Sequence, residues 1–405
     1  MKPSMLNRRT FLAASAATLA APRILHAADT PGVTATEIRI GNIMPYSGPA
    51  SSYGAIGKLE QVFFRVVNEQ GGIAGRKINY ITYDDGYSPP KTVEQARRLI
   101  EQDRVAYLFN TLGTPTNSAI LRYVNQRKVP HVFLATGADK WGDYKEHPWT
   151  IGWQPSYRTE AQIYTKYMLE QNPQAKLALL YQNDDFGKDY VLGVRDILGD
   201  RFDQMVKTAS YEVTDATIDS QIVSLQASGS DVLMAGATPK FAAQAIRKVH
   251  DIGWKPMFFM TNVSISVGSV IQPAGPEKAV GIITSAYLKD ATDPAWKDDP
   301  GMKEWRAFMN KYMPDADQTD GNYVYSYGVS KTLMQVLHQC GNDFSRENFM
   351  KQVTNLKDLE IPTLLPGIKV NTSPTNYHPI RQMQLQKWNG STWERFGNVI
   401  EGAEV

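Results

Sequence analysis

The sequence predicts an α/β protein whose strands lie in parallel sheets and whose chain forms two halves. Stretches typical of strands and of helices alternate along most of the chain, and the alternation restarts near Thr159. Strands joined by helices form right-handed β-α-β units, which place their strands parallel in one sheet. A length of 405 residues, with 42% hydrophobic and 21% charged residues, is typical of a packed chain of about two domains.

The first half predicts four strands and three helices. The first helix carries apolar side chains at Leu59, Phe63 and Val66, a spacing that buries one face, and Gly71 and Gly72 end it. The strands are expected at residues 37–41, 78–83, 105–109 and 131–134. The other two helices are expected to start at Pro89–Pro90 and to cover 117–126.

The second half repeats this order and then changes. Helices are expected at 159–171, 187–198 and 239–252, and strands at 176–181, 231–235, 256–260 and 280–285. The last third predicts helices at 301–312, 322–340 and 345–354, followed by strands at 367–370 and 381–388. Asn389–Gly390 then predicts a hairpin turn.

Residues 1–28 have the layout of an export signal peptide. Arg8 and Arg9 precede an apolar stretch at 11–21, and small residues follow near Ala27. The stretch is too short for the ~20 residues that span a bilayer. Residues 7–12 are similar to a twin-arginine export signal, so we expect a periplasmic protein. The alternative is a basic tail without a targeting role.

Composition and motifs argue against several functions. A net charge of +2 shows no basic excess for nucleic-acid binding, and the single cysteine, Cys340, excludes an intrachain disulfide. The phosphate-binding loop, the H-E-x-x-H motif and the G-x-S-x-G motif are all missing, and the histidines show no metal-ligand spacing. We therefore expect no catalysis, no cofactor and no metal ion.

Loops rich in Gly, Ser, Thr and Pro follow the predicted strands, where parallel sheets bind ligands. In the first half they cover 46–54, 111–117 and 135–141. Backbone N–H groups at a helix start, together with the hydroxyls of Thr114 and Thr136, would bind a carboxylate without Lys or Arg. The second half supplies loops at 183–187, 237–239 and 261–264, again beside helix starts. Turn formation and helix capping are the alternative roles of these residues.

Four short segments carry a family resemblance: Tyr46-Ser47-Gly48-Pro49, Gly71-Gly72-Ile73-x-Gly75, Tyr83-Asp84-Asp85 and Asp185-Phe186-Gly187. With them the chain resembles the periplasmic substrate-binding proteins of ABC transporters, in the leucine/isoleucine/valine-binding (type I) family. The resemblance implies two doubly wound parallel-sheet lobes joined by three hinge crossings, near 152–156, 284–288 and 367–371. It places residues 36–153 plus 288–367 in the first lobe, and 156–284 plus 371–405 in the second.

The resemblance also implies a ligand site between the lobes. A carboxylate would be bound by residues of two first-lobe loops: Gly113, Thr114, Thr136, Gly137 and Ala138. Tyr53 and Phe186 would supply aromatic contacts from the two lobes.

The amino-group acceptors of the family fall at Ala237 or Thr238 and at Asn262, none of which is charged. Because an ammonium group would lose its counter-charge, we expect an aromatic or apolar organic acid rather than an amino acid.

The expected function is ligand capture for an ABC importer. The partners would be a small-molecule carboxylate and the permease and ATPase subunits of the transporter. A branched-chain or other amino acid remains the alternative ligand, and a ligand-sensing receptor module the alternative role. An exported hydrolase would need a nucleophile and a base that the motifs do not supply.

Overall fold

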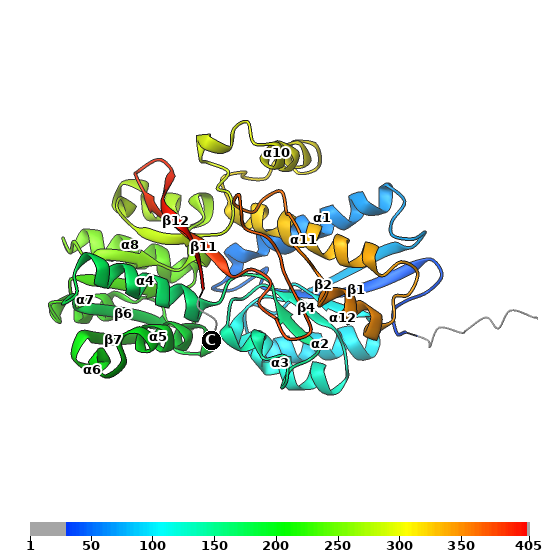
Figure 1. Ribbon diagram of the computed structural model, residues 1–405, viewed down its shortest axis with the longest axis horizontal. Coiled ribbons are helices and arrows are strands. Elements are labelled where there is room, and N and C mark those ends of the chain that lie inside the picture. The colour runs from blue at the N-terminus through cyan, green and yellow to red at the C-terminus, as the bar shows by residue number, and fades with distance from the viewer. Residues whose placement is uncertain (1–29, 403–405) are drawn as a thin grey trace, which may run out of the picture.

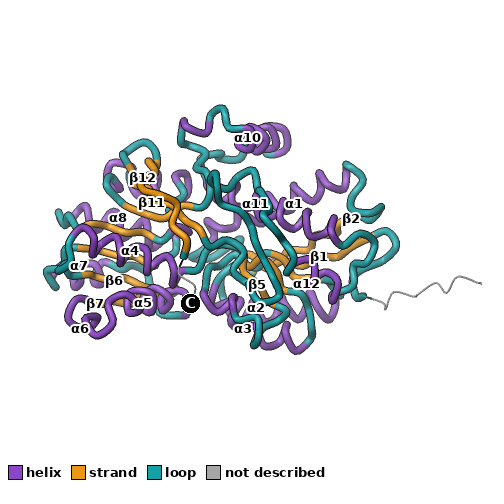
Figure 2. The backbone as a smooth tube through the Cα atoms, in the orientation of Figure 1, coloured by secondary structure: helices purple, strands orange, loops and turns teal. Residues whose placement is uncertain are grey.

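The computed structural model describes residues 30–402, so the export signal predicted at 1–28 lies outside the described residues. The described chain forms two lobes side by side (Figure 1). Each lobe is built on one sheet with helices against it (Figure 2). The predicted class, an α/β fold of two parallel-sheet lobes, is confirmed.

The first sheet is parallel throughout, in the order β2-β1-β3-β4-β5. Its strands are β1 (Glu37–Met44), β2 (Lys77–Asp84), β3 (Tyr107–Phe109), β4 (His131–Leu134) and β5 (Thr150–Gly152). Helices α1 (Gly54–Glu69), α2 (Pro89–Arg97) and α3 (Thr114–Gln126) follow the first three strands of the chain. The four predicted strands are confirmed. The three-residue β5 was not predicted, because its sequence Thr-Ile-Gly has a single apolar side chain, whereas the equally short β3 lies in an apolar run.

The second sheet has the order β12-β11-β10-β9-β8-β6-β7. Only β11 runs against the others: it pairs antiparallel with β10 and with β12, and all other pairs are parallel. The strands are β6 (Leu177–Gln182), β7 (Val206–Tyr211), β8 (Val232–Gly236), β9 (Met257–Met260), β10 (Ile283–Ala286), β11 (Gln382–Trp388) and β12 (Trp393–Glu401). The main helices are α4 (Tyr157–Gln171), α5 (Asp185–Leu198), α7 (Asp219–Ala227) and α8 (Pro239–Asp251), with the short α6 (Phe202–Met205) and α9 (Gln272–Ala274) between them. Trp388 pairs with Trp393 across the hairpin predicted at Asn389–Gly390.

The last third contributes α10 (Pro300–Tyr312), α11 (Gly321–Gln339) and α12 (Arg346–Val353). Helix α11 packs on α1, where Ser326 Oγ donates a hydrogen bond to Ile56 O at 2.8 Å. The ring of Phe349 in α12 stacks on Tyr107 of β3, with ring centroids 3.7 Å apart. Both helices therefore belong to the lobe of the first sheet, while β11 and β12 lie in the other lobe (Figure 1).

One predicted strand is wrong. Residues 367–370 form no strand, and within this run only Val370 makes a bridge, with Leu359. Gly367 takes a positive φ of 85° and Ile368 N bonds to Leu365 O, so the chain turns here instead of extending. The segment that pairs across the hinge lies just before it, where Leu364 bridges Leu288 in antiparallel fashion. The residue boundaries given above for the two lobes stay predictions.

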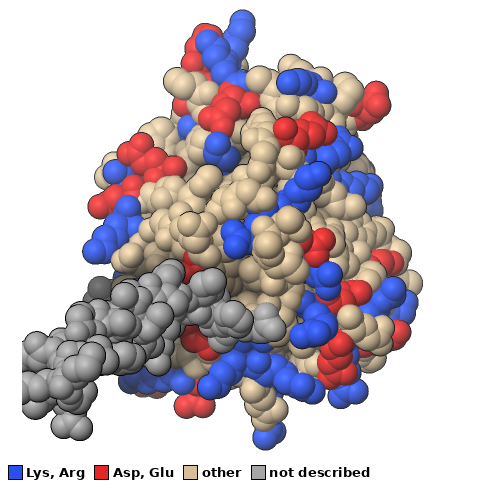
Figure 3. Space-filling view, turned by 90° about the vertical axis from the view of Figure 1, so that its right-hand side faces the viewer, with Lys and Arg blue, Asp and Glu red and all other residues tan. Residues whose placement is uncertain are grey.

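On the face that Figure 3 shows, the surface carries charges of both signs, in agreement with the balanced numbers of acidic and basic residues. Lysine and arginine side chains are interspersed with aspartate and glutamate over this end of the molecule, without a field of one sign. Within residues 30–402, none of the helices has the length and apolar character needed to cross a membrane.

Candidate functional site: a cleft between the lobes

A cleft with a cavity volume of about 120 Å³ lies between the two sheets, at the ends of their strands. Its lining comes from both lobes and from the segments that join them. Six aromatic side chains give the cleft a largely apolar surface: Tyr53, Tyr87, Tyr157, Phe186, Tyr287 and Tyr325. Polar groups are fewer and gather in separate places, which is the usual make-up of a small-molecule site.

The amino terminus of α3 forms one of these polar groups in the cleft lining. Gly113 and Thr114 line the cleft, and no side chain caps this helix. Gly113 has a positive φ of 101°, which lets the chain turn sharply from the strand end into the helix. An uncapped helix start with a threonine hydroxyl beside it is suited to bind an anion.

Six of the nine predicted site residues line the cleft: Tyr53, Gly113, Thr114, Phe186, Thr238 and Asn262. They come from loops that follow strands in both lobes, as expected.

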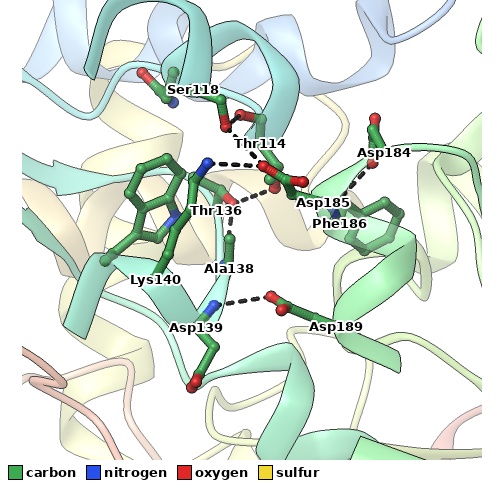
Figure 4. A network of polar contacts seen from close by, with 12 residues as sticks. Thr114, Ser118, Thr136, Ala138, Asp139, Lys140, Asp184, Asp185, Phe186 and Asp189 are labelled. Atoms are coloured by element: carbon green, nitrogen blue, oxygen red, sulfur yellow. Dashed lines mark hydrogen bonds and ion pairs between the residues drawn. The ribbon is translucent and has the colours of Figure 1, made fainter. Parts of the chain in front are cut away.

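The other three, Thr136, Gly137 and Ala138, are not among the lining residues, although Ala135 of the same loop is. The second carboxylate loop therefore stays a prediction. Thr136 is only 1% exposed and lies behind Thr114, with the two hydroxyl oxygens 2.6 Å apart. It also accepts hydrogen bonds from Ala138 N and Trp141 Nε1, so its hydroxyl supports the loop (Figure 4).

The aromatic residues pack across the cleft floor. Phe186 and Tyr157 meet edge to face with centroids 4.8 Å apart. Tyr53 belongs to the first lobe, yet its hydroxyl donates to Val263 O of the second lobe at 3.0 Å. The sequence did not single out Tyr157 and Tyr287, but both lie at or beside the crossings expected at 152–156 and 284–288.

The second-lobe wall holds a buried carboxylate that the sequence analysis missed. Glu160, in the first turn of α4, is completely buried. Its Oε1 accepts hydrogen bonds from the side chains of Ser285 at 2.5 Å, Tyr164 at 2.5 Å and Asn262 Nδ2 at 2.9 Å, and from Asn262 N at 3.0 Å. Tyr190 donates to Oε2. Burial raises the pKa of Glu160, and these hydrogen bonds oppose that rise.

The sequence analysis also missed two charged residues of the lining, Lys289 and Asp290. Lys289 Nζ lies 2.8 Å from Asp299 Oδ1 and 2.8 Å from Pro362 O, so its charge is already paired. Asp290 Oδ1 accepts from the backbone and hydroxyl of Thr292, and burial raises the pKa of Asp290. Within residues 30–402, no group of three or more His, Cys, Asp or Glu side chains is placed to hold a metal ion.

Contacts between the lobes close the cleft. Figure 4 shows Lys140 and Asp139 of the first lobe reaching the start of α5. Lys140 Nζ lies 2.8 Å from Asp185 Oδ2, and Asp139 N donates to Asp189 Oδ2 at 2.8 Å. Together with the bond from Tyr53 to Val263, these contacts show that the structure is in a closed form.

Comparisons with known proteins agree with this geometry. The family model described as periplasmic binding protein matches residues 37–392. A Leu/Ile/Val-binding protein homolog of Brucella suis is 22% identical over 371 residues, which cover 87% of this chain and 89% of the relative.

Two solved structures share the fold. A branched chain amino acid ABC transporter protein from Thermus thermophilus, with bound valine, aligns with a TM-score of 0.81 at 14% identity, over 92% of this chain and 98% of that one. A fatty acid ABC transporter substrate-binding protein from Thermomonospora curvata aligns with a TM-score of 0.74 at 20% identity, over 93% and 95% of the two chains.

Proposed function

This chain belongs to the periplasmic binding protein family, and from that premise we propose that it captures a small carboxylate with an apolar or aromatic body for an ABC importer. It is a binding protein rather than an enzyme. The observation that carries the proposal is the uncapped amino terminus of α3, which opens beside Thr114 into a cleft lined by six aromatic rings.

The carboxylate is proposed to lie at Gly113 and Thr114. The partial positive charge of a helix start and its N–H groups favour an anion without needing a cationic side chain. Lys289, the lysine in the lining, is paired with Asp299, so its charge is not available to bind the ligand's carboxylate in place of the helix start. A neutral donor set also releases its ligand more readily than a buried ion pair would.

The rings of Tyr53, Tyr157 and Phe186 are proposed to enclose the ligand's apolar body. Aromatic contacts of this kind contribute about 0.5–1.5 kcal/mol beyond the burial of area. Tyr53 and Phe186 come from different lobes, so the ligand body would be enclosed only when the lobes close. Ligand would thereby shift the hinge population towards the closed form.

An amino acid is the second candidate ligand. The names of relatives favour it: the Brucella suis protein is a Leu/Ile/Val-binding protein homolog, and the Thermus thermophilus structure holds valine. Asp290 is the acidic side chain in the lining, and Glu160 lies behind Asn262 and Ser285. Asp290 Oδ1 already accepts from Thr292, and Glu160 Oε1 from Asn262 and Ser285, so an organic acid stays our first choice.

The importer partners and export to the periplasm are part of the same proposal. The permease would recognise the closed form. A receptor module that feeds a sensor would use the same cleft, and genes for a permease and an ATPase beside this one would favour transport.

A binding panel tests the ligand class. Purified protein is first screened by thermal shift against aromatic acids, aliphatic acids and amino acids. The affinity of each compound that stabilises the protein is then measured by calorimetry. We expect aromatic or apolar acids to stabilise the protein, and Thr114→Val to weaken their binding about tenfold through loss of one charge-assisted hydrogen bond. Stabilisation by leucine alone would refute the organic-acid proposal.

A further inference from the structure

Asn262 lines the cleft with one end of its amide engaged and the other end unpaired. Its Nδ2 donates to Glu160 Oε1 at 2.9 Å. Its Oδ1 is buried and has no hydrogen-bond partner. A buried acceptor without a partner is costly, and a ligand that supplies a donor removes that cost.

The orientation of this amide is fixed by Glu160. The carboxylate oxygen Oε1 also accepts from Asn262 N and from Ser285 Oγ. Because a main-chain N–H can only donate, Oε1 must act as an acceptor. Turning the amide over would bring Asn262 Oδ1 against this acceptor, so Nδ2 stays towards Glu160.

This arrangement lies within one lobe. Glu160 belongs to α4, Asn262 follows β9, and Ser285 belongs to β10, all packed in the second lobe. The polarity of the cleft wall is therefore set before the lobes close on a ligand, which is the condition for discrimination by a preorganised site.

We propose that Glu160 is a positioning residue that holds Asn262 with its amide oxygen towards the ligand, so that the cleft selects organic acids carrying an N–H or O–H donor over acids carrying only acceptors. The inference deepens the proposed function and rests on it. The hydroxyl of an α-hydroxy acid can donate a hydrogen bond to Asn262 Oδ1. The matching α-keto acid would instead place its carbonyl oxygen, which can only accept, against Asn262 Oδ1, which is also an acceptor.

The test compares acids of equal skeleton. Phenyllactate is measured against phenylpyruvate, and α-hydroxyisocaproate against α-ketoisocaproate, by calorimetry with the full mature chain. We expect the hydroxy acid to bind about tenfold more tightly in any pair that binds, because a polar site strongly rejects the analogue that leaves its group unpaired. Equal or tighter binding of the keto acid overturns the proposal.

Variants separate positioning from folding. Asn262→Ala removes the amide oxygen and should bring the ratio of hydroxy-acid to keto-acid affinity close to one. Glu160→Met removes the acceptor behind the amide and should do the same. Glu160→Gln keeps a carbonyl oxygen at that place and should preserve the ratio. Glu60→Met is the matched control, since Glu60 is also completely buried and receives a tyrosine hydroxyl, from Tyr80, but lies outside the cleft lining.

If Glu160→Met fails to fold, the Asn262→Ala result decides. A ratio that survives Asn262→Ala, or that is lost in Glu160→Gln, overturns the proposal.

A readout without ligand keeps the inference separate from the proposed function. If none of the four acids binds, the proposed function fails, and the amide protons of Asn262 Nδ2 are then followed by nitrogen-15 NMR in the unliganded protein. Slow exchange with solvent supports the bond to Glu160. Exchange as fast as that of an exposed asparagine overturns it.

Discussion

Lys140 and Asp185 form an ion pair across the cleft, with Nζ 2.8 Å from Oδ2. Lys140 lies in a short helical turn of the first lobe, and Asp185 begins α5 in the second. The hydrogen bond from Lys140, together with the charge of Lys140, lowers the pKa of Asp185. The pair can form only when the lobes meet, so it belongs to the closed form and should affect closure rather than the contacts of the ligand itself.

Lys140→Met is expected to weaken ligand binding about twofold to threefold. Both partners are partly exposed, and a pair of this kind contributes less than about 1 kcal/mol. The wild-type advantage should shrink as NaCl is raised, because salt screens exposed charges. Calorimetry at low and high salt measures both effects. Lys145→Met, on the same loop but beside Tyr144, is the control and should change neither.

Asp189 makes closure dependent on pH. Burial at the interface between the lobes raises the pKa of Asp189 to about 7. The hydrogen bond from Asp139 N and the charge of Arg158 oppose this rise, and the charges of Asp139 and Asp185 add to it. In the open form we expect an ordinary aspartate pKa near 4. Closure therefore takes up a proton between about pH 4 and 7, and affinity should increase as the pH falls from 7.5 to 5.5.

Asp189→Asn should remove most of this pH dependence and bind ligand at pH 7.5 at least as tightly as the wild type. Calorimetry in two buffers of different ionisation enthalpy measures the proton taken up. Asp200→Asn, an exposed position just after α5, should behave as the wild type. Affinity that stays constant from pH 5.5 to 7.5 in the wild type contradicts this prediction.

Sequence patterns predicted the buried strands well and the edge of the second sheet poorly. Strands such as β4 and β8 are fully buried apolar runs, and they were found. The edge strand β7 has mostly exposed or half-buried residues, so it lacked the signal of a buried run.

The site shows the same limit. Loops that follow strands do line the cleft, but only the folded structure shows that Thr114 faces the cleft while Thr136 lies behind it. Glu160 was missed because a glutamate in the first turn of a helix is ordinarily a surface residue that favours the helix dipole. Its partners, among them Asn262 and Ser285, are 102 and 125 residues away in sequence.

Gly113→Ala is expected to damage both the fold and the site. Gly113 has a φ of 101°, and an added Cβ would lie 2.5 Å from Thr116 Oγ1 and 2.5 Å from the ring of Tyr87, which lines the cleft. The backbone strain alone should cost about 1–3 kcal/mol, because a φ of 101° with a ψ of 146° is a conformation that only glycine adopts readily. Binding should weaken more than tenfold, as measured by calorimetry.

Gly71→Ala is the matched control for that variant. Gly71 has a similar φ of 106°, but its added Cβ would meet nothing within 4 Å. It should lower the free energy of unfolding without weakening ligand binding. Equal loss of binding in both variants would show that strain, rather than displacement of Tyr87, is responsible.

His131 should make the first lobe sensitive to acid. The side chain is completely buried, with Nε2 2.6 Å from Thr111 Oγ1 and 3.1 Å from Asn117 Oδ1, while Nδ1 has no hydrogen-bond partner. Burial lowers the pKa of His131 to about 3, against about 6.5 in an unfolded chain. Between these values the unfolded chain binds the proton and the folded protein does not. Stability should therefore fall as the pH drops below 6.5, by up to about 1.4 kcal/mol per pH unit.

His131→Gln should flatten this dependence, at the cost of lower stability at pH 7.5 because the packing changes. Urea unfolding of ligand-free protein at pH 7.5, 6.5 and 5.5 measures the slope, and His250→Gln, at an exposed position, is the control. The effect is opposite in sign to that of Asp189, whose protonation favours the closed form as the pH falls. Measuring unfolding for one and ligand affinity for the other separates them, and an unchanged slope in His131→Gln would exclude His131 as the source of acid sensitivity.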